Sequence, residues 1–251
     1  MEEQNYQYQD VTYVQEGAIS KKFFANVFLF MFVALGLSTF AAYLFGINEG
    51  LMSYLANFDP TSGRIASMKP LGYVVMFAPL GLVLTMSFAL SKLSYPALLG
   101  IFIAYSVLTG ISLSFIMLSY TSGSIVGCFA SAAGIFGIMA FLGYTTDVDL
   151  SKFGPILMAG VIGLVVVSII NMFIGSDTLG YILGFVGIAI FTALTAYKVQ
   201  EIKRIGEGLD ENGNEIALAD SKKLALMGAL SLYITFINLF LSLLRVFGDR
   251  R

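Results

Sequence analysis

The run Phe23–Phe45, FFANVFLFMFVALGLSTFAAYLF, decides the fold class of this chain. It contains no charged side chain, and it is long enough to form a helix across a hydrocarbon layer of about 30 Å, which takes about 20 apolar residues. Lys21 and Lys22 precede it directly, where cationic side chains reach the membrane interface. Because the segment before them is polar and acidic, the run is predicted to be a retained transmembrane helix and not a cleaved signal peptide.

Similar apolar runs recur along the rest of the chain, separated by short polar or proline-containing connections. They predict seven transmembrane helices, at about 23–45, 71–90, 97–118, 124–142, 155–173, 179–197 and 224–246. We expect one transmembrane domain, 23–248, between a polar N-terminal segment, 1–22, and a tail, 249–251. The connection 46–70 is predicted to be a loop with one short interfacial helix near 51–56.

The composition supports an all-α integral membrane protein. Hydrophobic residues make up 57% of the chain and charged residues only 12%, values that exclude an ordinary soluble domain. The net charge is -2, and the charges are crowded into a few short stretches, so no basic face is expected to bind nucleic acid. The lipid bilayer is therefore the predicted main partner of the protein.

The sequence gives little support to an enzyme or to a cofactor site. Histidine is absent, which removes every Ser-His and Cys-His dyad, and no aspartate lies inside a predicted span. The single cysteine, Cys128, lies in an apolar run and is predicted to be a buried hydrophobic residue. The stretch Asp210–Glu215 is rich in oxygen ligands, but Gly213 follows Asp210 too closely for a calcium loop, so we expect a solvated turn and no metal site.

The distribution of basic residues predicts the orientation. The Lys and Arg residues expected on the N-terminal side are nine: Lys21, Lys22, Lys92, Lys152, Lys198, Lys203, Arg204, Lys222 and Lys223. Those expected on the other side are five: Arg64, Lys69, Arg245, Arg250 and Arg251. Since basic residues concentrate in cytoplasmic loops, the N-terminus is predicted to be cytoplasmic and the C-terminus to lie on the opposite side.

Ionisable and polar residues near membrane depth are the candidate functional residues. Lys198 ends the sixth predicted span, and Glu201 lies three residues further on the same helical face. Either Lys198 extends towards the interface and pairs with Glu201, or both residues line an ion path. In the seventh span, Thr235 and Asn238 either hydrogen-bond within the helix bundle or line the same path.

Small residues at four-residue spacing are the other feature of the spans. Gly123 and Gly127 in the fourth span, and Gly180 and Gly184 in the sixth, place small residues on one helix face. This spacing lets helix backbones approach closely, so we expect packing inside the bundle; a dimer face is the alternative.

Four stretches together resemble the Bax inhibitor-1 family, in a bacterial seven-helix form of the transmembrane Bax inhibitor motif-containing type. They are ALSLYITFINLF at 229–240 with Leu243-Leu244-Arg245 after it, FTALTAYKVQEI at 191–202, Asp149-Leu150-Ser151 and Gly110-Ile111-Ser112-Leu113. Their order and spacing agree with the family over about 23–248. The resemblance implies a central seventh helix wrapped by two three-helix layers.

For some members the resemblance also implies a calcium leak that responds to pH through two aspartates on helices six and seven. Lys198 and Thr235 stand at those two positions in this chain, and Lys92 stands near a basic residue of the family at the end of helix two. A cation repels calcium, by about 4 kcal/mol per unit charge at 4 Å and an effective dielectric constant of 20. We therefore expect a weak or absent calcium leak without acid gating.

Two functions follow from the sequence and the resemblance. The first is an ion channel of calcium-leak type, carrying calcium or monovalent cations, with Lys198, Glu201, Thr235 and Asn238 along the path. The alternative is a non-conducting binding partner, for example a modulator of a membrane-anchored ATP-dependent protease. Its contact surfaces would be the acidic segment Glu2–Glu16 and the charged stretch 198–223. A bacterial inner membrane is the expected location for either function.

Overall fold

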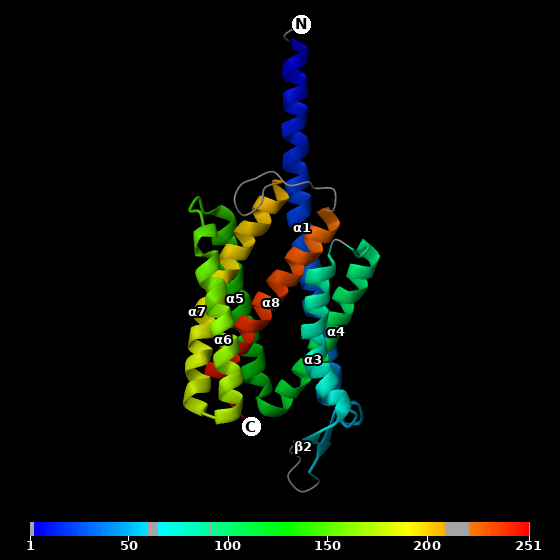
Figure 1. Cartoon of the computed structure of the whole chain (residues 1–251), viewed down its shortest axis with the longest axis vertical. Helices are drawn as coiled ribbons and strands as arrows, with labels where there is room; N and C mark the ends of the chain where they lie inside the picture. The colour runs from blue at the N-terminus through cyan, green and yellow to red at the C-terminus, as the bar shows by residue number, and fades with distance from the viewer. Residues whose placement is uncertain (1–2, 60–64, 91, 209–220, 251) are drawn as a thin grey trace. The chain divides into compact units, whose positions relative to one another are not determined.

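The computed structural model describes residues 3–59, 65–90, 92–208 and 221–250, which are almost entirely helical (Figure 1). The elements are α1 (Glu3–Ile47), α2 (Glu49–Met52), β1 (Ala56–Phe58), β2 (Ile65–Met68), α3 (Pro70–Ala89), α4 (Tyr95–Ser119), α5 (Ser122–Thr145), the 3-10 turn η1 (Ser151–Phe153), α6 (Gly154–Ile174), α7 (Asp177–Gly206) and α8 (Ser221–Phe247). Within the described residues, α1 and α3–α8 are the seven helices long and apolar enough to cross a membrane. The prediction of an all-α membrane protein with seven spans is confirmed.

Local sequence signals explain where several helices begin and end. Proline occupies the first turn of α3, α4 and α6, where its missing N–H leaves no hydrogen bond unmade. Helix α6 ends at Gly175, whose φ of 69° lies in the left-handed region that glycine adopts without a steric penalty. Ser176 then caps α7 by accepting a hydrogen bond from the N–H of Leu179 at 3.2 Å.

The connection between α1 and α3 differs in part from the prediction. A short helix is present, but as α2 at Glu49–Met52 and not over 51–56. A two-stranded antiparallel hairpin of β1 and β2 follows it, with Ala56 paired to Met68. Strands of three and four residues are too short to leave a recognisable alternation in the sequence. Lys69 stabilises the base of this hairpin by donating from Nζ to the Ser53 carbonyl at 2.6 Å. Arg64 lies outside the described residues.

Two helices extend far beyond the predicted spans. Helix α1 begins at Glu3, well ahead of its apolar run, and α7 continues past Tyr197 to Gly206. The extension of α7 has a clear cause, because Val199 and Ile202 remain buried on its packed face. Lys203 and Arg204 in its last turn also interact favourably with the negative end of the helix dipole.

The chain divides into two compact units. Unit 1 comprises Met1–Leu29 and Gly127–Phe247, and unit 2 comprises Phe30–Val126 and Gly248–Arg251. In unit 2, α3 packs along α4, and the Ser38 hydroxyl of α1 donates to the Ser106 carbonyl of α4 at 2.7 Å. A buried cluster of Met52, Leu55 and Val75 closes one end of this unit.

In unit 1, α7 packs along both α6 and α8. In the most apolar 18-residue window of each span, 67% of the residues of α8 are buried, whereas none of the described residues in the window of α6 is. Helix α8 is therefore surrounded by protein, and α6 exposes its apolar side chains as a lipid-facing helix does. This burial agrees with a central seventh helix, while the two-layer arrangement around it stays a prediction.

The two glycine pairs differ in how closely other helices pack against them. A Cβ at Gly184 of α7 would lie 2.6 Å from Cγ2 of Val246, so the predicted close approach of helices is confirmed there. A Cβ at Gly123 or Gly127 of α5 would meet no atom of the described residues within 4 Å. The prediction that these two glycines pack inside the bundle is wrong, because they lie on an open face of α5.

Candidate functional site

The last three turns of α7 carry the charged and polar residues that define the candidate site. Lys198 Nζ donates to Oε2 of Glu201 at 2.6 Å, as the three-residue spacing predicts. The two side chains are only 17% and 18% exposed, so the pair is largely withdrawn from water inside the helix bundle. Lys198 Nζ also lies 5.0 Å from the centre of the Tyr197 ring, a distance at which a cation is attracted to the ring face.

Gln200 binds the connection between α5 and α6, residues 146–153. Its side-chain carbonyl accepts from the N–H of Leu150 at 2.8 Å, and its amide nitrogen donates to the carbonyl of Val148 at 2.8 Å. The Gln200 residue is 7% exposed. One buried side chain therefore satisfies a backbone donor and a backbone acceptor of a segment about 50 positions away in the sequence.

Asp149 in the same connection pairs with Arg204 of α7. One nitrogen of the Arg204 guanidinium donates to Oδ1 of Asp149 at 2.6 Å, and Ser151 donates to the same oxygen from its hydroxyl at 2.6 Å and from its N–H at 3.1 Å. These hydrogen bonds, those from Ser151 first and that from Arg204 next, lower the pKa of Asp149 to about 2. Asp149 is therefore ionised throughout the physiological pH range.

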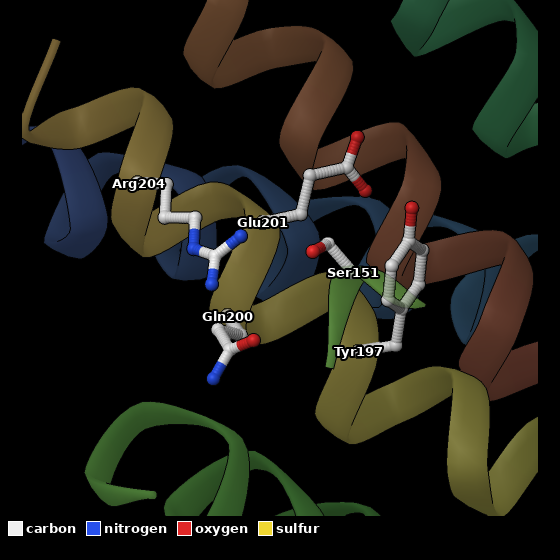
Figure 2. A pocket seen from close by; sticks show the side chains of 5 residues that line it. All are labelled: Ser151, Tyr197, Gln200, Glu201 and Arg204. Carbon is white, nitrogen blue, oxygen red and sulfur yellow. The ribbon is translucent and has the colours of Figure 1, made fainter. Parts of the chain in front are cut away.

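A small cavity lies where these contacts meet. It is lined by Ser151 of η1 and by four residues of α7, namely Tyr197, Gln200, Glu201 and Arg204, and Figure 2 shows Ser151 beside these side chains. Its volume of about 10 Å³ is room for about one water molecule. The cavity thus lies between Ser151 of the α5–α6 connection and α7, whose residue Glu201 pairs with Lys198.

Close packing holds the two helices that flank the connection against α7. A Cβ at Gly154, the first residue of α6, would lie 2.7 Å from the Tyr197 hydroxyl oxygen. A Cβ at Gly143, near the end of α5, would lie 2.8 Å from Cα of Ala196. Only glycine fits at such distances, so both ends of the connection are fitted closely to α7.

A third contact places Phe24, at the start of the α1 span, in the same region of unit 1. Lys203 donates from Nζ to the carbonyl of Tyr144 at 3.1 Å and lies 5.2 Å from the centre of the Tyr144 ring. The Tyr144 ring in turn packs against Phe24 of α1, with 4.8 Å between ring centres. The start of the α1 span, the end of α5 and the end of α7 therefore lie at one end of unit 1, as alternating membrane crossings require.

The polar residues of α8 bond chiefly to their own helix. Thr235 is 5% exposed and donates to the carbonyl of Ser231 at 2.9 Å, and Asn238 donates to the carbonyl of Ile234 at 2.8 Å. These are contacts to the preceding turn that such residues form in apolar surroundings. Each of the two side chains therefore has a hydrogen-bond partner within its own helix.

The remaining candidates from the sequence are Lys92 and the stretch Asp210–Glu215, and no described contact joins either to this site. Lys92 is exposed in the connection between α3 and α4 and belongs to unit 2. The stretch Asp210–Glu215 lies outside the described residues. Among the described residues, no three side chains of His, Cys, Asp or Glu gather closely enough to hold a metal ion.

Sequence reasoning had not assigned a role to Asp149, Ser151, Gln200 or Arg204. Asp149 and Gln200 lie within two stretches that carry the family resemblance. The residues of these stretches do not indicate that the two stretches contact each other in the fold. The separation of 55 positions between Asp149 and Arg204 leaves no periodic signal, so their pairing becomes visible only in the folded chain.

Comparison with known proteins gives matches over nearly the whole chain. The family described as inhibitor of apoptosis-promoting Bax1 matches residues 20–251. The inner membrane protein YbhL of Escherichia coli K12 is 37% identical over 238 residues, which cover 95% of this chain and 96% of YbhL. A protein of Borreliella burgdorferi, described as uncharacterized, is 39% identical over 237 residues, covering 94% of this chain and 96% of that protein. A membrane protein of Streptococcus pyogenes serotype M1 is 37% identical over 240 residues, covering 95% and 97% respectively.

Proposed function

This chain belongs to the Bax inhibitor-1 family of multi-pass membrane proteins, and we propose that it is an ion-leak protein of that family with a weak calcium leak and no acid gate. The proposal includes no chemical step catalysed by the protein. The observation that carries it is the Lys198–Glu201 pair at the end of α7.

An acid gate of the kind implied by the resemblance needs two carboxylates at close range. Two such groups cannot both ionise cheaply, so one of them binds a proton near neutral pH and the contact changes with pH. Lys198 and Thr235 offer an ammonium group and a hydroxyl group at the corresponding positions, and the ammonium group is already paired. We therefore expect flux through this protein to vary little between acidic and alkaline pH.

The weak calcium leak follows mainly from missing ligands. Glu201 offsets much of the charge of Lys198, so the repulsion of calcium is smaller than an isolated lysine would exert. Calcium normally takes six to eight oxygen ligands, several of them carboxylates. The absence of any cluster of three acidic, His or Cys side chains among the described residues supports poor calcium binding along the path.

Flux in proteoliposomes tests the proposal. The native protein is compared with the double variant Lys198→Asp, Thr235→Asp for calcium and potassium flux at pH 6 and pH 8. Lys152→Asp, a charge reversal at an exposed residue of η1, is the control for altered surface charge. We expect the double variant alone to gain a calcium leak that changes with pH. If neither the native protein nor the variant conducts any ion, the ion-leak proposal is wrong.

A second candidate function is a non-conducting partner of another membrane protein, such as a membrane-anchored ATP-dependent protease. The observation that favours it is the extension of α1, because residues 3–20 continue the helix ahead of the span Lys21–Ile47. This segment contains Glu3, Asp10 and Glu16 and no Lys or Arg. An acidic helix outside the membrane suits a basic protein surface.

Crosslinking followed by co-purification distinguishes this candidate. A partner captured by the full chain should be lost when residues 2–16 are deleted, while flux stays unchanged. Retention of the partner by the deleted chain would exclude the acidic segment as the contact.

We also propose that the protein lies in a bacterial inner membrane with a cytoplasmic N-terminus. The excess of basic residues on the N-terminal side supports this orientation. The similarity to a protein named for the inner membrane of E. coli supports the location.

A further inference from the structure

We propose that the α5–α6 connection, residues 146–153, is a lid over the Lys198–Glu201 pair, and that Gln200 and Arg204 latch it shut. When the lid is latched, it limits the access of water to an ion pair inside a transmembrane helix. This device goes beyond the ion-leak proposal, since it concerns how the pair is hydrated whether or not the protein conducts.

Hydrogen bonds between the connection and the side chains of Gln200 and Arg204 form the latch. Gln200 holds the N–H of Leu150 and the carbonyl of Val148, each at 2.8 Å, and Arg204 holds the carboxylate of Asp149 at 2.6 Å. Gln200 and Arg204 are four residues apart, so they lie on one face of α7. Together they hydrogen-bond to three consecutive residues of the connection, 148–150. These contacts fix the backbone of the connection against the helix.

One member of the ion pair, Glu201, lies beside the latched connection. Glu201 lies between the two latch residues in sequence and lines the cavity that Ser151, Gln200 and Arg204 also line (Figure 2). The cavity is small, at about 10 Å³, and Lys198 and Glu201 are only 17% and 18% exposed, so little solvent reaches the pair while the connection is in place. Lifting the connection would remove Ser151 from the cavity and open the Glu201 carboxylate to solvent.

Opening of the lid would weaken the ion pair between Lys198 and Glu201. An ion pair is strong where water is excluded and weak where water surrounds it, because the effective dielectric constant rises. Release of the lid therefore loosens Lys198 from Glu201 and makes its ammonium group accessible from the aqueous side.

Two measurements on the same purified protein, in detergent micelles or nanodiscs, test the lid. Hydrogen exchange followed by mass spectrometry reports the amides of residues 146–153, and acetylation by a water-soluble amine reagent reports the accessibility of Lys198. Lys92, which is exposed and lies outside the connection, is the internal reference for reagent concentration and reactivity.

The test variant is Gln200→Leu, which keeps a side chain of similar size and loses both hydrogen bonds to the connection. The control is Lys203→Gln, which changes a neighbouring residue of α7 whose contact is to Tyr144 and not to the latched segment. We expect exchange at residues 148–151 to become about tenfold faster in Gln200→Leu, as the loss of two buried hydrogen bonds would give. Acetylation of Lys198 should accelerate several-fold with it, while acetylation of Lys92 and both readouts of the control variant stay as in the native protein.

The proposal is overturned if the connection opens without faster acetylation of Lys198, or if exchange at 148–151 does not change. Exchange within α8 shows whether the variant has kept its fold. If Gln200→Leu also exposes α8, Arg204→Gln replaces it, since this variant removes the ion pair with Asp149 and leaves both hydrogen bonds of Gln200 in place, and the same two readouts then decide.

Discussion

Nζ of Lys198 lies 2.6 Å from Oε2 of Glu201, one turn further along α7. Both side chains are more than four-fifths shielded from solvent, yet the pair belongs to a single helix and not to two helices that could move apart. Lys198, at one of the two positions that the resemblance associates with pH sensing, thus carries a charge that is neutralised within its own helix. A pair of this kind contributes to stability chiefly because removing one member leaves a buried charge without its partner.

Glu201→Gln should therefore destabilise the protein. We expect a loss of about 1–3 kcal/mol, less than for a fully buried pair because some solvent reaches the site. The double variant Lys198→Met, Glu201→Met should recover most of this loss. Cys128 is buried, so its reaction with a thiol-reactive fluorophore during heating reports unfolding without an introduced probe. Equal melting temperatures for the native protein and Glu201→Gln would contradict the prediction.

The hydrogen bonds that Asp149 accepts from Ser151 and Arg204 should make stability depend on pH only under strongly acidic conditions. The folded-state pKa of about 2 lies below the ordinary aspartate pKa of about 3.9, so the contribution is complete above about pH 5 and is lost as the pH falls towards 2. Asp149→Asn should lower the melting temperature by an amount that is constant from pH 6 to pH 8 and vanishes near pH 2. Circular dichroism at each pH measures it, and a difference that changes between pH 6 and pH 8 would refute the assignment.

Gly143→Ala should loosen the packing of α5 on α7. The added methyl group would meet the backbone of Ala196, which cannot move as a side-chain tip can, so we expect a cost of about 1–3 kcal/mol. Gly137→Ala on the same helix is the matched control, because no described atom lies within 4 Å of the added Cβ. The control should be neutral or slightly stabilising, by up to about 1 kcal/mol, since alanine favours a helix over glycine. The labelling assay on Cys128 compares both variants with the native protein.

Thr235→Val should have little effect on folding. The hydroxyl of Thr235 donates to a carbonyl of its own helix, so its removal leaves no group on another helix unsatisfied, and we expect a change below about 1 kcal/mol. Leu232→Ala, also buried on α8, is the contrasting variant, with an expected cost of about 2–5 kcal/mol from the cavity it leaves. A large loss of stability in Thr235→Val would show that the Thr235 hydroxyl makes a hydrogen bond that the fold requires.

Cysteine labelling should place Asp147 and Asp249 on opposite sides of the membrane. In a Cys128→Ser background, Asp147→Cys should react from the cytoplasmic side and Asp249→Cys from the other side, since Asp147 lies in the connection after the fourth span and Asp249 follows the seventh. An impermeant thiol reagent applied to intact cells and to inverted vesicles makes the comparison. Labelling of both variants from the same side would exclude an odd number of spans between them.

Hydrogen bonds of Asp249 provide a check on the side of the membrane predicted for it. The N–H of Thr121 donates to the carbonyl of Asp249 at 3.1 Å, and the N–H of Asp249 donates to the Ser124 hydroxyl at 2.9 Å. The end of the chain therefore lies against the turn between α4 and α5 within unit 2. Thr121→Cys should accordingly react from the same side as Asp249→Cys.

The seven spans could be predicted from the sequence because membrane insertion depends on properties of short segments. A run such as Phe23–Phe45 is apolar over the full thickness of the hydrocarbon layer, and no contact with the rest of the chain is needed to recognise it. The pairing of Lys198 with Glu201 was predictable for the same reason, since helical periodicity places residues three apart side by side. The β1–β2 hairpin escaped prediction because strands of three and four residues carry too little periodic signal.

The rest of the candidate site was decided by tertiary structure. Nothing in the local sequence of Gln200 indicates that it binds Val148 and Leu150, and the open face at Gly127 looks in sequence like the packed face at Gly184. Burial of a polar side chain and close approach of two backbones depend on which helices become neighbours. Hydropathy and spacing therefore determined by themselves that this chain crosses the membrane seven times, whereas helix packing decided which of its polar residues meet, because those contacts join segments about 50 residues apart.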